Sequence, residues 1–123
     1  IEWRAMDVVY EWLVGEGYAE GDIRDTAATR PYDYEVGPED RPLLRVEAKG
    51  LSGPLGPVEI TDGELGSARA GVETVLAVVH GIAVTVEEQG EFVGTGGVLW
   101  IERPWSPRNE DLVPTRYRYT PRR

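Results

Sequence analysis

The chain has 123 residues, of which 41% are hydrophobic, and this is enough for one domain with a single core. Its net charge of −9 excludes a protein that coats nucleic acid through a generally basic surface. With no cysteine and one histidine, disulfides, thiolate metal sites and an imidazole-based zinc site are excluded. No apolar run approaches the roughly 20 residues of a membrane span, so we expect no membrane contact and a cytoplasmic setting.

The first part of the chain predicts a helix followed by three strands. An amphipathic helix is expected over residues 2–14. Its apolar side chains recur every three or four positions and are expected to face the core: Trp3, Met6, Val9, Tyr10 and Leu13. Strands are expected over residues 22–27, 32–36 and 42–49. The turn composition of residues 37–40 predicts that the second and third strands form an antiparallel hairpin.

The second part predicts another helix and further strands. Residues Thr61 to Glu64 match a capping box, which predicts a helix that runs to about Gly71. Strands are expected over residues 74–80, 82–87 and 98–102, with a turn-rich insertion over residues 88–97. This order predicts an α/β (α+β) domain in which a central mixed β-sheet is flanked by helices.

The end of the chain differs in charge from the rest. We expect a domain over residues 1–104 and an arginine-rich tail over residues 105–123. Residues 103–123 contain six arginines and two acidic residues, a net charge of +4. The tail is either a solvated terminus or an arm that contacts phosphates. The candidates for nucleic-acid binding are Arg103, Arg108, Arg116 and Arg118. Trp105 is expected to pack in the core or at its edge, and base stacking is the alternative to test for it.

The strand over residues 42–49 carries the candidate chemistry. Glu47 and Lys49 share one face of it, and Lys49 is the only lysine among 13 basic residues. With Asp33 on the preceding strand, two carboxylates and the backbone carbonyl of Ala48 can hold Mg²⁺ or Mn²⁺. The lysine can then orient a water molecule or neutralise a transition state. The alternative is a structural ion pair on a half-solvated sheet.

Four motifs together carry a family resemblance over about residues 1–80: Glu2, Ala5 and Val9; Tyr32-Asp33-Tyr34; Val46-Glu47-Ala48-Lys49-Gly50; and Ile60-Thr61-Asp62-Gly63-Glu64. They resemble the PD-(D/E)XK nuclease superfamily, which has the restriction-endonuclease-like fold. More closely, they resemble the NO VEIN C-terminal domain family, a domain of unknown function. The proline of the superfamily name corresponds to Pro31, one residue earlier than the pattern places it.

The resemblance implies an αβββαβ core and a Mg²⁺-dependent endonuclease that hydrolyses phosphodiester bonds of DNA. It implies that Asp33, Glu47 and Lys49 are catalytic and that Glu2 is an additional metal ligand. For Glu64, helix capping suffices as a role.

The resemblance also implies helicase, ATPase or methyltransferase modules in the same chain or operon, in a restriction–modification, phage-defence or DNA-repair system. Because the chain starts at Ile1, we expect it to come from a larger protein. The alternative is a catalytically weak or inactive module of the same fold that binds nucleic acid or docks to a helicase or ATPase.

Overall fold

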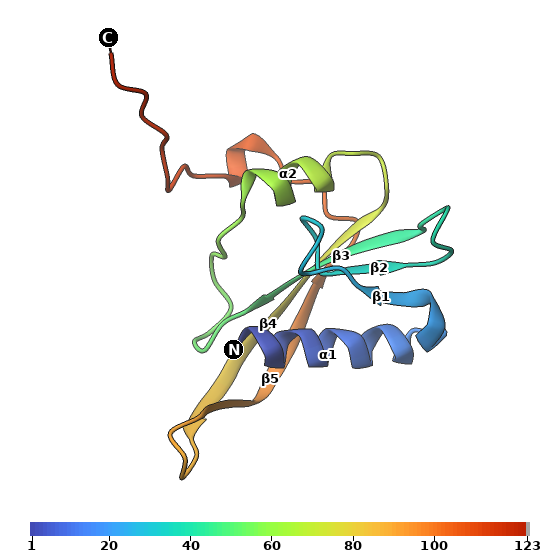
Figure 1. Cartoon of the computed structure of the whole chain (residues 1–123), viewed down its shortest axis with the longest axis vertical. Helices are drawn as coiled ribbons and strands as arrows, with labels where there is room; N and C mark the ends of the chain where they lie inside the picture. Colours follow the sequence, from blue (N-terminus) through green and yellow to red (C-terminus); the bar gives the residue numbers. More distant parts are fainter. Residues whose placement is uncertain (123) are drawn as a thin grey trace.

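One five-stranded mixed sheet forms the centre of the fold (Figure 1). This computed structural model describes residues 1–122. The helices are α1 (Glu2–Gly15) and α2 (Asp62–Ala68). The strands are β1 (Ile23–Asp25), β2 (Tyr34–Val36), β3 (Leu44–Gly50), β4 (Thr74–Val86) and β5 (Phe92–Glu102). The prediction of a mixed α/β fold with a helix, three strands, a second helix and further strands is confirmed.

The strands lie in the sheet in their order along the chain, β1-β2-β3-β4-β5. Every neighbouring pair is antiparallel except β3 and β4, which are parallel and are connected through α2. The expected hairpin of β2 and β3 is present, and its register pairs Tyr34 with Val46. The two helices cover opposite faces of the sheet (Figure 1).

Each face of the sheet has its own apolar cluster. On the α1 face, Ala5, Val9 and Leu13 pack against alternate side chains of the central strands. These strand side chains are Leu44, Val46, Ala48, Val75, Ala77 and Val79. On the α2 face the cluster is smaller and consists of Leu76, Val78 and Trp105, with Ala68 of α2 among the residues packed against it. Among residues 1–122, no helix is both long and apolar enough to cross a membrane.

The buried face of helix α1 differs from the expected one at the first turn of the helix. Ala5, Met6, Val9 and Leu13 are buried, but Trp3 is 81% exposed, so the prediction that it faces the core is wrong. An α-helix turns by about 100° per residue, which places Trp3 about 120° around the axis from Val9. The three-to-four spacing from Trp3 to Met6 was therefore not enough to place Trp3 on the buried face.

The segment from residue 74 to residue 102 forms one long hairpin. The predicted strands 74–80 and 82–87 are a single strand, β4, and most of the predicted insertion belongs to β5. The prediction was wrong because glycines were taken as turn signals. Gly97 has a φ of +102°, and a Cβ atom there would lie 2.6 Å from Cγ1 of Val79, so only glycine fits this position in β5.

The segment after β5 begins against the body of the domain. Trp105 is 6% exposed, and its backbone amide donates to the carbonyl oxygen of Thr74 at 2.6 Å. The expectation that Trp105 packs in the core or at its edge is therefore confirmed, and the alternative of base stacking is wrong, because its ring is buried on Leu76 and Val78. Farther on, the hydroxyl of Thr115 donates to Glu59, and the residues that follow extend away from the body (Figure 1).

Candidate functional site

Strand β3 presents its polar side chains to the α2 face, as its alternation predicts. Val46 and Ala48 are buried on the α1 side, whereas Lys49 contacts α2 through Glu64. Glu47 shares the face of Lys49 and is only 3% exposed. A carboxylate and an amine are therefore held together on an inner face of the sheet, at the carboxyl end of β3.

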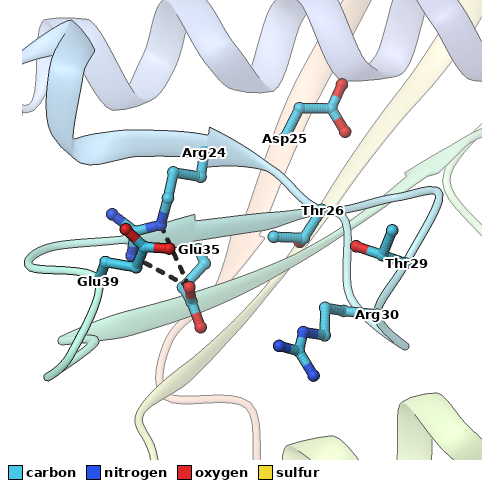
Figure 2. A pocket seen from close by; sticks show the side chains of 7 residues that line it. All are labelled: Arg24, Asp25, Thr26, Thr29, Arg30, Glu35 and Glu39. Carbon is cyan, nitrogen blue, oxygen red and sulfur yellow. Dashed lines mark hydrogen bonds and ion pairs between the residues drawn. The ribbon is translucent and has the colours of Figure 1, made fainter.

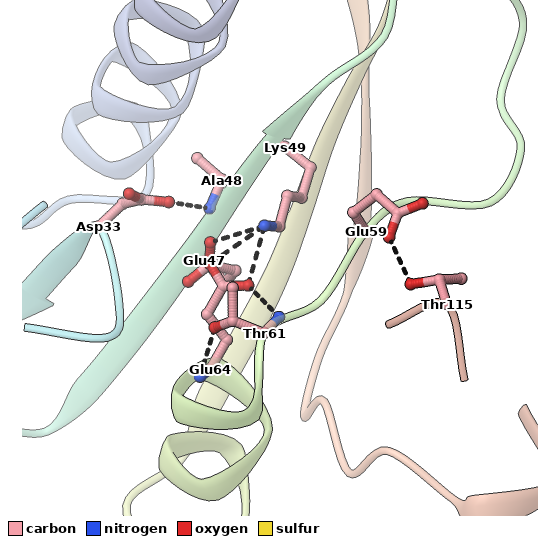
Figure 3. A network of polar contacts seen from close by, with 8 residues as sticks. All are labelled: Asp33, Glu47, Ala48, Lys49, Glu59, Thr61, Glu64 and Thr115. Carbon is pink, nitrogen blue, oxygen red and sulfur yellow. Dashed lines mark hydrogen bonds and ion pairs between the residues drawn. The ribbon is translucent and has the colours of Figure 1, made fainter. Parts of the chain in front are cut away.

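Asp33 lies where β2 begins and is fixed to β3 through two hydrogen bonds. Its backbone amide donates to the carbonyl of Val46 at 2.9 Å, and its Oδ2 atom accepts from the amide of Ala48 at 2.7 Å (Figure 3). Because the N–H and C=O groups of a strand residue point to the same edge, the carbonyl of Ala48 also faces this side. Burial raises the pKa of Asp33, although the hydrogen bond from Ala48 opposes the shift.

Glu47 is the most strongly perturbed group of the site. One oxygen, Oε1, lies 3.4 Å from the Nζ atom of Lys49, while the other, Oε2, is buried without a hydrogen-bond partner. Burial raises the pKa of Glu47 to about 10, and the nearby carboxylates of Glu64 and Asp33 raise it further than Lys49 lowers it. At neutral pH this carboxyl group therefore retains its proton.

Lys49 is held by a second acidic residue. Both oxygens of Glu64 accept from its Nζ atom, at 3.0 and 3.1 Å. Burial lowers the pKa of Lys49, but the hydrogen bonds and charges of Glu64 and Glu47 outweigh burial, so the pKa is raised. Burial likewise raises the pKa of Glu64, and its contacts with Glu47, Thr61 and Lys49 together lower it below its usual value. Lys49 is thus a stable cation.

The same Glu64 closes the predicted capping box of α2, which is confirmed. Its amide donates to the hydroxyl of Thr61 at 3.1 Å, and its Oε1 atom accepts from the amide of Thr61 at 2.8 Å (Figure 3). The sequence assigned only this capping role to Glu64, whereas the structure adds the contact with Lys49. One general rule could have indicated this contact: a helix that connects two parallel strands starts near the carboxyl end of the first strand.

The donor set at this site fits a magnesium or manganese ion. Mg²⁺ is usually bound through one or two carboxylates and several waters, and Asp33, Glu47 and the carbonyl of Ala48 offer such oxygens. The buried, unpartnered Oε2 atom of Glu47 is the kind of group that a cation would satisfy. Among residues 1–122, no three acidic or histidine side chains converge as a preformed set of ligands.

Glu2 is not brought into this group of residues. It is the first residue of α1, it is exposed, and no hydrogen bond or ion pair among residues 1–122 joins it to Asp33, Glu47 or Lys49. Helix α1 also covers the face of the sheet opposite to the one that carries Glu47. A role of Glu2 as a metal ligand therefore remains an expectation of the family resemblance.

The four candidate arginines divide into two pairs. Arg103 donates to Glu73 at 2.9 Å and to the hydroxyl of Tyr18, and these contacts raise its pKa. Arg108 forms ion pairs of 3.1 Å with two acidic residues that follow it. Arg116 and Arg118 are exposed, and neither has an ion pair in the part of the chain that the structure describes.

A hollow of about 530 Å³ lies beside β1 and β2 rather than at the Asp33–Lys49 group (Figure 2). Its lining combines basic, acidic and hydroxyl side chains: Arg24, Asp25, Thr26, Thr29, Arg30, Glu35 and Glu39. Arg24 is committed to the fold, because it forms an ion pair of 3.1 Å with Glu35 and donates to the carbonyl of Gly37 at 2.6 Å. The candidate chemistry therefore lies outside this hollow.

Comparisons of the chain with protein-family models, with curated proteins and with solved structures give no match. The functional assignment therefore depends on the geometry of Asp33, Glu47, Lys49 and Glu64 and on the motifs of the sequence.

Proposed function

We propose that this chain is a metal-dependent nuclease domain that hydrolyses phosphodiester bonds of DNA. One observation carries the proposal: Asp33, Glu47 and the only lysine of the chain meet at the point where β2 and β3 separate. Two carboxyl groups and an amine in this arrangement are suited to phosphoryl chemistry, in which charge on phosphate oxygens must be stabilised. A surface ion pair alone does not account for the buried, unpartnered oxygen of Glu47.

The element order supports the same proposal. The chain has a helix, three strands, a helix and a further strand before its last hairpin strand, and the α2 connection makes β3 and β4 parallel. This order agrees with the αβββαβ core of the restriction-endonuclease-like fold that the sequence resembles. Glu47 and Lys49 lie in β3, which is the position that the resemblance implies, and Asp33 lies one residue before β2, although the resemblance places it on that strand.

Each side chain has a role that follows from its contacts. The hydrogen bond from Ala48 fixes the carboxylate of Asp33 against β3, so its free oxygen is held in place for a ligand. Lys49 is kept protonated by Glu64 and can donate to a phosphate oxygen as negative charge develops there. In the reaction a water oxygen forms a bond to phosphorus and a phosphorus–oxygen ester bond breaks. A proton of the water passes to solvent, and the departing oxygen takes up a proton from solvent to form a hydroxyl group.

Asp33, Glu47 and the carbonyl of Ala48 would hold Mg²⁺ or Mn²⁺, which supplies positive charge that lowers the pKa of a water and offsets charge on the phosphate. Glu47 must lose its proton to act as a ligand, because metal ligands bind in their deprotonated form. Its high pKa therefore makes proton release part of metal binding.

The test is cleavage of supercoiled plasmid DNA with Mg²⁺, Mn²⁺ or EDTA. Asp33→Ala and Lys49→Ala are expected to reduce cleavage by at least about 100-fold. Asp40→Ala and Arg41→Ala are matched controls, because both residues are exposed in the turn between β2 and β3. Equal cleavage by all five proteins would contradict the proposal. Metal binding without cleavage, measured by calorimetry, would instead identify a catalytically inactive module of the same fold.

A further inference from the structure

The last residues of the chain alternate arginine with tyrosine. From Leu112 to the C-terminus the sequence has four arginines and no acidic residue, and Arg116-Tyr117-Arg118-Tyr119 occupy successive positions. Tyr117 and Tyr119 are 83% and 74% exposed. A soluble domain has no packing reason to display two tyrosines beside two arginines, so this segment is a candidate for binding a ligand.

The charge of this segment is not used inside the fold. The body of the domain is strongly acidic, and Arg103 pairs with Glu73 of the body, whereas Arg108 pairs with Glu110 and Asp111, which follow it in the chain. Arg116 and Arg118, by contrast, form no ion pair within residues 1–122. Their positive charge is therefore available to an anionic partner, and the acidic body restricts where such a partner can lie.

The segment starts next to the candidate site. The hydroxyl of Thr115 donates to Glu59 at 3.1 Å, and Glu59 lies two residues before Thr61, whose amide donates to Glu64 (Figure 3). Glu64 in turn holds Lys49. One end of a partner bound along residues 116–122 therefore lies near the face of the sheet that carries Lys49, although the segment itself extends away from the body.

We propose that residues 116–122 are an arm that binds single-stranded nucleic acid through its phosphates and its bases. Arginines bind phosphates, and tyrosine rings stack on bases whose faces are free, as they are in a single strand but not in a duplex. When such a segment is extended, alternate side chains lie on opposite sides, so cations follow the backbone on one side and rings meet bases on the other. Such an arm indicates single-stranded nucleic acid as the substrate class of the nuclease proposed above. The part of the inference that concerns cleavage rests on that proposed function.

Binding is tested separately from cleavage by fluorescence anisotropy in EDTA, with labelled oligo(dT), oligo(U) and a DNA duplex of the same length. The wild-type chain is expected to bind the single strands more tightly than the duplex. Tyr117→Ala and Tyr119→Ala are each expected to weaken this binding about 5- to 150-fold. The pair Arg116→Gln and Arg118→Gln should reduce the salt slope of log K by about 1.4, at about 0.7 per phosphate contact of a single strand.

Matched controls separate the arm from general effects of charge or exposed rings. Arg41→Gln removes an exposed arginine from the turn between β2 and β3, and Trp3→Ala removes an exposed ring from α1, so both should bind as the wild type does. Tighter binding of the duplex, or wild-type binding by Tyr117→Ala/Tyr119→Ala, would overturn the arm. Asp33→Ala must retain binding. If this variant binds but does not cut, the proposed arm and the proposed nuclease are both supported. If binding persists while no protein cuts, including the wild type, only the nuclease proposal fails.

Discussion

Glu64 holds Lys49 with both of its carboxylate oxygens, at 3.0 and 3.1 Å, although 15 residues separate them in the chain. The same carboxylate caps α2 through Thr61. A helix terminus therefore positions the only lysine of the protein. The two roles of Glu64 are separable, because one depends on its oxygen as an acceptor and the other on its charge.

We expect Glu64→Gln to lower the pKa of Lys49, because the charge that raises this pKa is removed while an acceptor for the Thr61 amide remains. Lys49 is the only lysine, so its Cε resonance can be followed by NMR without overlap from other lysines. The control, Thr61→Ala, should cost about 1 kcal/mol of stability through loss of the cap and should leave Glu64 paired with Lys49. An unchanged lysine titration in Glu64→Gln would contradict this role.

Replacement of Lys49 by arginine should keep the fold but reduce DNA cleavage by at least about tenfold. Arginine retains the positive charge for Glu64, but its planar guanidinium cannot replace a compact ammonium in a site where the side chain is only 20% exposed. Plasmid cleavage and thermal unfolding, measured on the same preparation, check this. Full cleavage by Lys49→Arg would show that a positive charge alone suffices.

Glu47→Gln should stabilise the metal-free protein above about pH 5. The folded state raises the pKa of Glu47 from 4.5 to about 10, so the folded chain binds more protons than the unfolded chain between these values, and its stability falls as pH rises through this window. Glutamine removes this penalty and is expected to add about 1–3 kcal/mol at pH 7. Urea unfolding at pH 4 and pH 8 checks it: the gain should be small at pH 4, and an equal gain at both values would refute the assignment.

Gly97→Ala should destabilise the protein by about 3 kcal/mol, because its φ is +102° and the added Cβ would meet Val79 at 2.6 Å. Gly96→Ala is the matched control. It shares a positive φ of +70° but has no atom within 4 Å, so the cost should be about 1 kcal/mol, from backbone strain alone. Chemical denaturation of both variants measures the difference, and equal losses would place the cost in the backbone and not in packing.

Truncation to alanine should lower the stability of the protein strongly at one tryptophan and hardly at all at another. Trp105→Ala is expected to cost about 3 kcal/mol, since the ring is 6% exposed and packs on Leu76 and Val78. Trp3→Ala should change the free energy of unfolding by less than about 0.5 kcal/mol, because this ring is 81% exposed. A small effect at Trp105 would mean that the segment after β5 does not belong to the folded unit.

Local patterns in the sequence were sufficient to predict α1, the alternation of β3 and the cap of α2, because each of these depends on residues that are close together in the sequence. They failed at Trp3, where spacing alone did not fix the direction of the helix face, and at Gly97, where packing against Val79 permits a glycine inside a strand. They also did not identify the partners of Trp105, which are almost 30 residues away in the chain.

The candidate site was predicted in its members but not in its connections. Asp33, Glu47 and Lys49 follow from strand order and alternation, and the register of Tyr34 with Val46 places Asp33 beside Glu47. The contact between Lys49 and Glu64 was missed because local pattern does not show it, and only the rule that the helix between two parallel strands starts near the carboxyl end of the first strand could have indicated it. The same limit applies to the arginines, since their acidic partners are tertiary or turn contacts.

The parallel pairing of β3 with β4 has a consequence for the order of folding during synthesis. β3 pairs with β4 from Arg45 opposite Thr74 to Gly50 opposite Val79, and α2 connects the two strands. A nascent chain that ends before β4 has Asp33, Glu47, Lys49 and Glu64 but lacks the strand that fixes α2 over β3. The arrangement of these four side chains therefore requires β4, so a chain that lacks this strand carries the residues of the candidate site without their arrangement.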